Sequence, residues 1–223
     1  MDALPPALLF LGIIPALILL YISLKGYEGL YKDKTIFLTF VIGIIAGFVS
    51  VLMEYYTAGV GMLFMIILFP VLEQLFKTII LNVGRLQEKR ETTIYGLSLG
   101  LGFGSIFTPF AIIVSNSQGG IYTLSIALTV LGSFGIILLH GATGVCIGYG
   151  VYQRELPKYF IFAVFLYLPV TASYLTVPFG LGYLQLGLVP YGLVVYWYAT
   201  KKIMPQILSQ SQRRRSKKWD RNK

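Results

Sequence analysis

Ionisable side chains interrupt otherwise apolar runs of the sequence at Glu54, Glu73, Lys77 and His140. In FPVLEQLFKT, Glu73 and Lys77 are four residues apart, which places them on one helix face with the glutamate first, the favoured order for an ion pair. They are expected to bond to each other or to a common partner. His140, the only histidine, lies in GIILLHGATG and could bind a metal, move a proton or hydrogen-bond to a neighbour.

The composition predicts that these runs cross a membrane, which makes each buried ionisable side chain a candidate functional residue. Hydrophobic residues make up 56% of the chain, charged residues only 12%, and the mean hydropathy is +0.75. The apolar runs have the length of about 20 residues that a helix needs to cross a bilayer. We therefore expect an all-α integral membrane protein.

Seven apolar runs are expected to form a seven-transmembrane-helix bundle. Basic residues gather in the loops 25–34, 84–93 and 152–158 and after residue 200, whereas the intervening loops have none. The positive-inside rule then places the N-terminus outside and the C-terminus in the cytoplasm. The expected spans are 4–24, 35–55, 58–83, 94–115, 121–151, 159–178 and 182–199.

The chain divides into a transmembrane domain at 1–203 and a basic cytoplasmic tail at 204–223. The net charge of +9 is concentrated in RRRSKKWDRNK, at the end of the tail. Such a run is typical of an anchor on anionic lipid, and a partner protein or, less favoured, RNA is the alternative. We expect lipid and no nucleic acid. Cys146 is the only cysteine, which excludes an intrachain disulfide.

Depth in the membrane suggests that the polar side chains meet. Counted from the basic residues Arg85 and Arg154, Glu73 and His140 lie about 18 and 21 Å along their helices at ~1.5 Å per residue. Lys77 lies closer to the inner interface, and Glu54 lies at the outer end of its span, where an interfacial role is expected. For His140 a structural hydrogen bond to Glu73 or a neighbour is favoured over a metal site or a ligand contact.

Glycine spacing predicts a close helix contact. Gly96, Gly100 and Gly104 repeat every four residues and form a flat groove along one helix face, and Gly144 and Gly148 repeat the spacing after His140. The groove could pack against another helix of this chain or against a second chain, including a second copy.

The sequence lacks the residues that several classes of membrane enzyme need. Asp2, Asp33 and Asp220 all lie outside the spans, which excludes an intramembrane aspartyl protease. The last span has no lysine for a retinal Schiff base, and no rhomboid-type serine motif accompanies the histidine. A metalloprotease needs about three ligands and a general base, so Glu73, His140 and Gln74 are an incomplete set.

Three segments in order, LEQLFK, GLSLGLGFG and IILLH, resemble the anterior pharynx-defective (Aph) subunit of γ-secretase. The expected number and orientation of spans is also similar to that family. The resemblance extends to PrsW-type and CAAX-prenyl-type membrane metalloproteases. The chain departs from their catalytic pattern with Glu73-Gln74 in place of two glutamates, and with GSIFTPF where they have a glutamate. It departs from Aph subunits with Tyr167 in place of a second histidine.

This resemblance implies a non-catalytic scaffold that binds a presenilin-like membrane aspartyl protease and needs no cofactor. It implies helix-contact roles for the glycines and a polar cluster of Glu73, Gln74, Lys77, His140 and Tyr167. The alternative is a PrsW-like or CAAX-like metalloprotease with a reduced zinc site, in which Glu73 and His140 would be catalytic or metal-binding. Transport of a small solute stays open. The short chain and loops favour a prokaryotic cell membrane.

Overall fold

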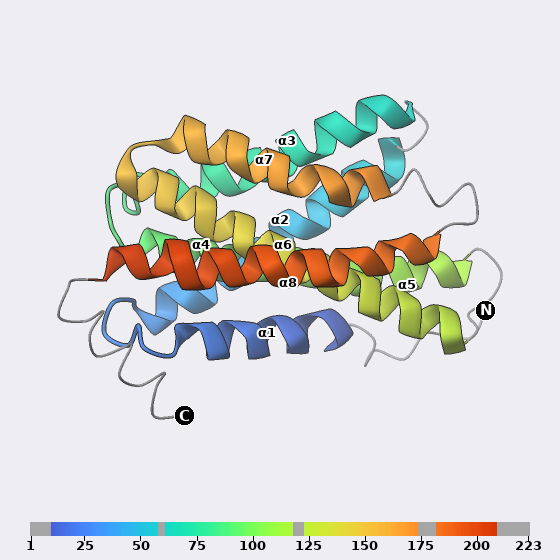
Figure 1. Cartoon of the computed structure of the whole chain (residues 1–223), viewed down its shortest axis with the longest axis horizontal. Coiled ribbons are helices and arrows are strands. Elements are labelled where there is room, and N and C mark those ends of the chain that lie inside the picture. Colours follow the sequence, from blue (N-terminus) through green and yellow to red (C-terminus); the bar gives the residue numbers. More distant parts are fainter. Residues whose placement is uncertain (1–9, 58–60, 118–122, 174–181, 209–223) are drawn as a thin grey trace.

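The computed structural model describes residues 10–57, 61–117, 123–173 and 182–208, and all regular elements in these ranges are helical. The elements run along one common axis (Figure 1). They are α1 (Phe10–Leu24), α2 (Asp33–Thr57), α3 (Met62–Leu81), α4 (Thr92–Ser105), α5 (Phe107–Ser117), α6 (Thr123–Gln153), α7 (Leu156–Ser173), η3 (Gly182–Gly187), α8 (Leu188–Tyr198), η4 (Ala199–Ile203) and η5 (Met204–Ile207).

The all-helical fold and the membrane character agree with the sequence. Four described stretches are long and apolar enough to cross a bilayer: Asp33–Thr57, Thr92–Val114, Ala127–Gln153 and Leu156–Ser173. The helices follow the seven expected segments, although the count of seven spans stays a prediction. The fourth segment is divided into α4 and α5, and the last continues through η4 and η5.

Pro109 explains the break between α4 and α5. Proline has no backbone N–H, so the Ser105 carbonyl lacks its usual helical donor four residues later. That carbonyl instead faces α1, where a Cβ added to Gly12 would lie 1.9 Å from the Ser105 oxygen. Gly12 therefore allows α1 to approach the end of α4.

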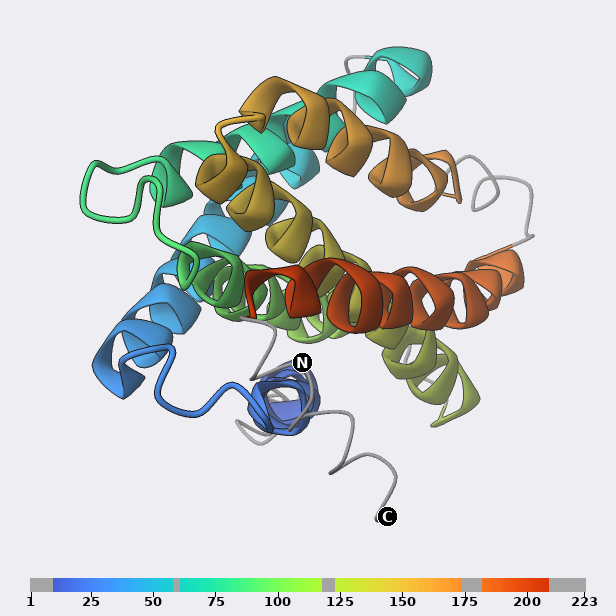
Figure 2. The same ribbon diagram turned by 60° about the vertical axis from the view of Figure 1, so that its left-hand side comes forward.

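Helix α4 forms the centre of the bundle, and all its residues are buried. Helix α6 packs along one side of it and α2 along another, while α1 lies on the opposite side of the molecule from the paired helices α3 and α7 (Figures 1 and 2). This arrangement surrounds α4 with other helices of the same chain.

The predicted glycine groove is filled by α6. A Cβ on Gly96 would lie 2.2 Å from the Gly144 carbonyl oxygen, and one on Gly100 would lie 2.1 Å from the His140 carbonyl oxygen. A Cβ on Gly148 would meet the Thr92 carbonyl at 2.5 Å. The expectation of a helix contact is thus met within the chain. The alternative, that this face binds a second chain, is wrong, because the backbone of α6 occupies it.

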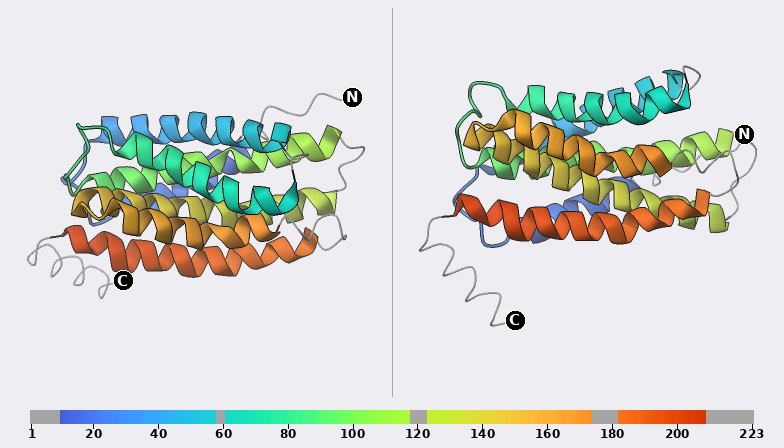
Figure 3. Two further views of the ribbon diagram at one scale, coloured as in Figure 1. Left: turned by 90° about the horizontal axis from the view of Figure 1, so that it is seen from above. Right: turned by 45° about the horizontal axis from the view of Figure 1, so that its top comes forward.

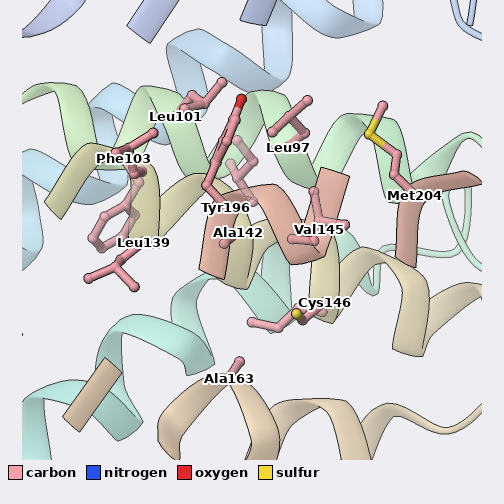
Figure 4. Packing of buried hydrophobic residues seen from close by; sticks show 14 of the residues in the cluster. Leu97, Leu101, Phe103, Leu139, Ala142, Val145, Cys146, Ala163, Tyr196 and Met204 are labelled. Carbon is pink, nitrogen blue, oxygen red and sulfur yellow. The ribbon is translucent and has the colours of Figure 1, made fainter. Parts of the chain in front are cut away.

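Large apolar side chains close the space around this contact. Figure 4 shows Leu97 and Leu101 of α4 beside Ala142 and Val145 of α6, with Met204 of η5 nearby. Met204, Ile207 and Leu208 are all buried. The bundle therefore extends to residue 208, beyond the boundary at 203 expected from the sequence.

The connections that carry basic residues gather at one end of the bundle. Figures 1 and 3 show the connections α1–α2, α3–α4 and α6–α7 together there. Glu88 and Arg154 both adopt left-handed backbone conformations, with φ of 60° and 59°, and their side chains form an ion pair at 2.5 Å. This hydrogen bond raises the pKa of the Arg154 guanidinium above its usual value, so the arginine stays charged.

A buried polar cluster

One face of α3 carries Glu73, Gln74 and Lys77 into the interior. Each is at most 1% exposed, although α3 is otherwise an apolar helix. The face meets α6 and α7, which supply His140 and Tyr167, both also within 1% of complete burial. The structure thus brings the five residues of the predicted polar cluster into one region.

Lys77 lies among three hydrogen-bond acceptors. Its Nζ is 3.0 Å from Gln74 Oε1, 2.8 Å from His140 Nδ1 and 2.8 Å from Thr143 Oγ1. An ammonium group has three protons, and each has an acceptor here. The cation is therefore fully hydrogen-bonded inside the bundle.

His140 uses both ring nitrogens. Because the ammonium of Lys77 only donates, Nδ1 must accept, and the ring proton is assigned to Nε2. Nε2 lies 2.8 Å from the Tyr167 hydroxyl and donates to its oxygen. The imidazole is thus a neutral bridge between Lys77 and Tyr167.

Glu73 extends the cluster toward α2. Its Oε1 accepts a hydrogen bond from Ser50 Oγ at 3.3 Å, and the Tyr167 hydroxyl faces the carboxylate. Since Tyr167 accepts from His140, its own proton is left to point to Glu73. Within the described residues Glu73 Oε2 has no hydrogen bond. Glu54, half-buried near the end of α2, is close enough to act electrostatically on Glu73.

Aromatic rings enclose the imidazole. Ring centroids of Phe103, Phe107 and Tyr167 lie 4.7, 5.0 and 4.6 Å from that of His140. Lys77 Nζ is 5.0 Å from the Phe103 ring centroid, within range of a cation–π interaction. These walls shield the polar chain from lipid and strengthen its electrostatic interactions.

The glycine repeat also makes room for the histidine. A Cβ on Gly104 would lie 2.8 Å from the Ile137 Cα and 3.1 Å from the His140 Cβ. Small residues on α4 therefore let α6 approach closely enough to direct His140 between Phe103 and Lys77.

The hydrogen-bond partners of Glu73 and Lys77 differ from a direct ion pair between the two side chains. Glu73 and Lys77 were expected to bond to each other or to a common partner. Within the described residues, the ion pairs closer than 4 Å join Arg154 to Glu88 and Lys158 to Glu155, so the first of these arrangements is absent. The two side chains are connected through His140 and Tyr167 instead. The hydrogen-bond partners of His140 are therefore Lys77 and Tyr167, and not Glu73.

Four residues that contact the polar cluster were not predicted from the sequence: Ser50, Phe103, Phe107 and Thr143. Thr143 follows His140 by one helical turn, which is a signal for a shared face. The other three lie on α2, α4 and α5, and no local pattern links them to the histidine.

These residues do not fit a zinc site. Zinc binds a neutral histidine through a free nitrogen lone pair, whereas Nδ1 of His140 accepts from Lys77 and Nε2 carries a proton for Tyr167. An ammonium cation at this position would repel a metal ion. Within the part of the chain that the structure describes, no three His, Cys, Asp or Glu side chains form a metal-binding group.

Comparison of the chain with protein-family models, with curated proteins and with solved structures gives no match.

Proposed function

We propose that this protein is a non-catalytic membrane scaffold, in which the buried polar cluster fixes how the helices pack. The observation that carries the proposal is the hydrogen bonding of Lys77 and His140. The ammonium has three protein acceptors and the imidazole has a protein partner on each nitrogen. Lys77 and His140 therefore have a structural use, and neither has a free polar side-chain atom for a substrate.

The cluster joins helices that lie far apart in the sequence. Lys77 comes from α3, His140 from α6 and Tyr167 from α7, while Ser50 of α2 contacts Glu73. A shifted helix would leave these groups without partners in lipid, although each hydrogen bond contributes only about 1 kcal/mol. The polar groups thus stabilise one relative position of these helices over the others.

The substitution His140→Ala tests this role. We expect a lower thermal midpoint in mild detergent, because Lys77 loses an acceptor and the aromatic walls lose a packed ring. Zinc is measured in the same purified samples. Stoichiometric zinc in the wild-type protein that is lost in His140→Ala, with little change in stability, would instead support the reduced metalloprotease.

The proposed partner is a presenilin-like membrane aspartyl protease, as the resemblance to Aph subunits implies. Since the glycine face of α4 lies against α6, a partner would contact the outer helix surfaces. On α2, Phe37 is 71% exposed and Ile45 is 59% exposed, and they are candidates for this contact.

Affinity purification of the tagged chain from its native membranes, followed by mass spectrometry, tests the partner. Recovery of a presenilin-like protease with the wild type, and its loss with the bulkier apolar surface variant Ile45→Trp at unchanged thermal stability, is the expected result. A chain that is consistently purified alone would contradict the assembly role.

The proposed topology has seven spans, with the N-terminus outside and the C-terminus in the cytoplasm of a prokaryotic cell. The gathering of basic connections at one end supports it. Gln87→Cys and Gln118→Cys should differ in labelling by a membrane-impermeant maleimide on intact cells. Only the residue 118 variant should react, and the reverse pattern would invert the topology.

A further inference from the structure

A second polar feature lies outside the buried cluster, at the end of the bundle where the basic connections gather. A cavity of about 690 Å³ opens between the first turns of α2, the last turns of α3 and the connection to α4. Figures 1 and 3 place the start of α2, the end of α3 and the connection to α4 at this same end of the bundle.

The walls of the cavity are apolar. Leu38 and Ile42 line it from α2, and Ile79, Ile80 and Val83 line it from the other side. Leu38, Ile79 and Val83 are also more than half exposed. A gap between two membrane-exposed helices with such walls matches a hydrocarbon chain better than a soluble polar ligand.

The rim of the cavity is positively charged. Lys32, Arg85 and Lys89 line it, against one acidic residue, Glu91. Within the described residues, the ion pairs closer than 4 Å join other side chains. Lys32, Arg85 and Lys89 therefore have no acidic group within 4 Å among those residues. The rim therefore has an excess of positive charge available to an anion.

A buried hydroxyl lines the same cavity. Tyr95 is only 4% exposed, and its oxygen accepts a hydrogen bond from the Lys32 backbone N–H at 3.1 Å. None of the described residues accepts the Tyr95 hydroxyl proton. This proton can be donated to a phosphate oxygen at the rim.

We propose that this cavity binds one anionic phospholipid, with an acyl chain between α2 and α3 and the phosphate near Lys32, Arg85, Lys89 and Tyr95. Basic pockets between membrane helices are suited to anionic head groups, and the apolar walls account for the tail. This site is separate from the expected lipid contact of the C-terminal tail. It does not depend on the scaffold function or on the identity of any protein partner.

Native mass spectrometry of the full chain in mild detergent, with phosphatidylglycerol and phosphatidylcholine in equal amounts, tests the proposal. We expect one retained phosphatidylglycerol per chain. The double variant Arg85→Gln/Lys89→Gln should weaken its binding roughly tenfold. Lys34→Gln/Arg90→Gln removes two neighbouring charges that do not line the cavity and should leave binding unchanged.

A further variant separates a lipid from a free phosphate. Ile79→Trp should fill the apolar gap and reduce lipid retention while every basic residue remains. Millimolar inorganic phosphate should not displace the lipid. Equal retention of both lipids, an equal loss in the control variant, or displacement by phosphate together with no effect of Ile79→Trp would each overturn the proposal.

Discussion

At the scale of single residues, the hydrogen bonds of the polar cluster form a chain that runs from donor to acceptor in one direction. Lys77 donates to His140, His140 donates to Tyr167, and the remaining Tyr167 proton points to Glu73. A lysine and a glutamate are thus linked through two neutral groups. This linkage explains why a lysine and a glutamate can share an apolar interior without direct contact.

Tyr167 offers a test of that linkage. Tyr167→Phe keeps the ring but leaves the His140 Nε2 proton without an acceptor, which should destabilise the fold by about 1–3 kcal/mol. Tyr167→His, which supplies a ring nitrogen as acceptor, should recover part of the loss. Thermal midpoints in detergent measure both, and equal destabilisation by the two variants would show that only packing matters at this position.

Lys77→Met should destabilise the fold more than the similar lengths of the lysine and methionine side chains suggest. The apolar side chain leaves three buried acceptors, on Gln74, His140 and Thr143, without a donor. Each unsatisfied group costs on the order of 1 kcal/mol or more. The thermal midpoint should fall clearly, whereas Lys34→Met at an exposed position should change little, and equal midpoints for the two variants would contradict the structural role of Lys77.

At the scale of elements, the contact between α4 and α6 controls where the polar groups lie. Their backbones approach so closely that glycine is needed on both helices, at Gly96 and Gly144 for example. The same approach brings His140 beneath Phe103. Packing and hydrogen bonding therefore depend on one geometry.

Gly100→Ala tests this contact. The added methyl would lie 2.1 Å from the His140 carbonyl oxygen, so the helices must separate, and overpacking of this kind costs about 1–3 kcal/mol. Gly132→Ala is the matched control on α6, because its methyl would meet nothing closer than 3.8 Å and alanine favours a helix. We expect a lower thermal midpoint for the first variant and an equal or higher one for the second. A Gly100→Ala variant as stable as the control would contradict the close contact.

The elements could be predicted from hydropathy, but their mutual rotation could not. Depth counted from Arg85 and Arg154 placed Glu73 and His140 at similar heights, yet it carries no information on their angular positions around the bundle. The sequence consequently left the partner of His140 open between Glu73 and a neighbour. In the structure Lys77 and Tyr167 bond to it, and Glu73 faces Ser50. A glycine repeat likewise indicates close packing without naming the helix that supplies it.

At the scale of the whole molecule, residues 204–208 complete the bundle. The boundary expected from the sequence, at residue 203, lies just after the last apolar run. In the structure, η5 continues the last helix along the core, and Gln206 Oε1 accepts a hydrogen bond from the Tyr149 hydroxyl at 2.6 Å. Residues 204–208 therefore contribute to folding, and the basic run follows them.

Two truncations separate these roles. A chain ending after Leu208 keeps the buried residues Met204, Ile207 and Leu208 and should retain its thermal midpoint, because only the segment with the basic run is removed. A chain ending after Ile203 loses all three and the hydrogen bond to Tyr149. Burying each large apolar side chain contributes about 1.5–3 kcal/mol, so this shorter chain should unfold at a clearly lower temperature. Equal midpoints for the two truncations would show that the bundle ends at 203 after all.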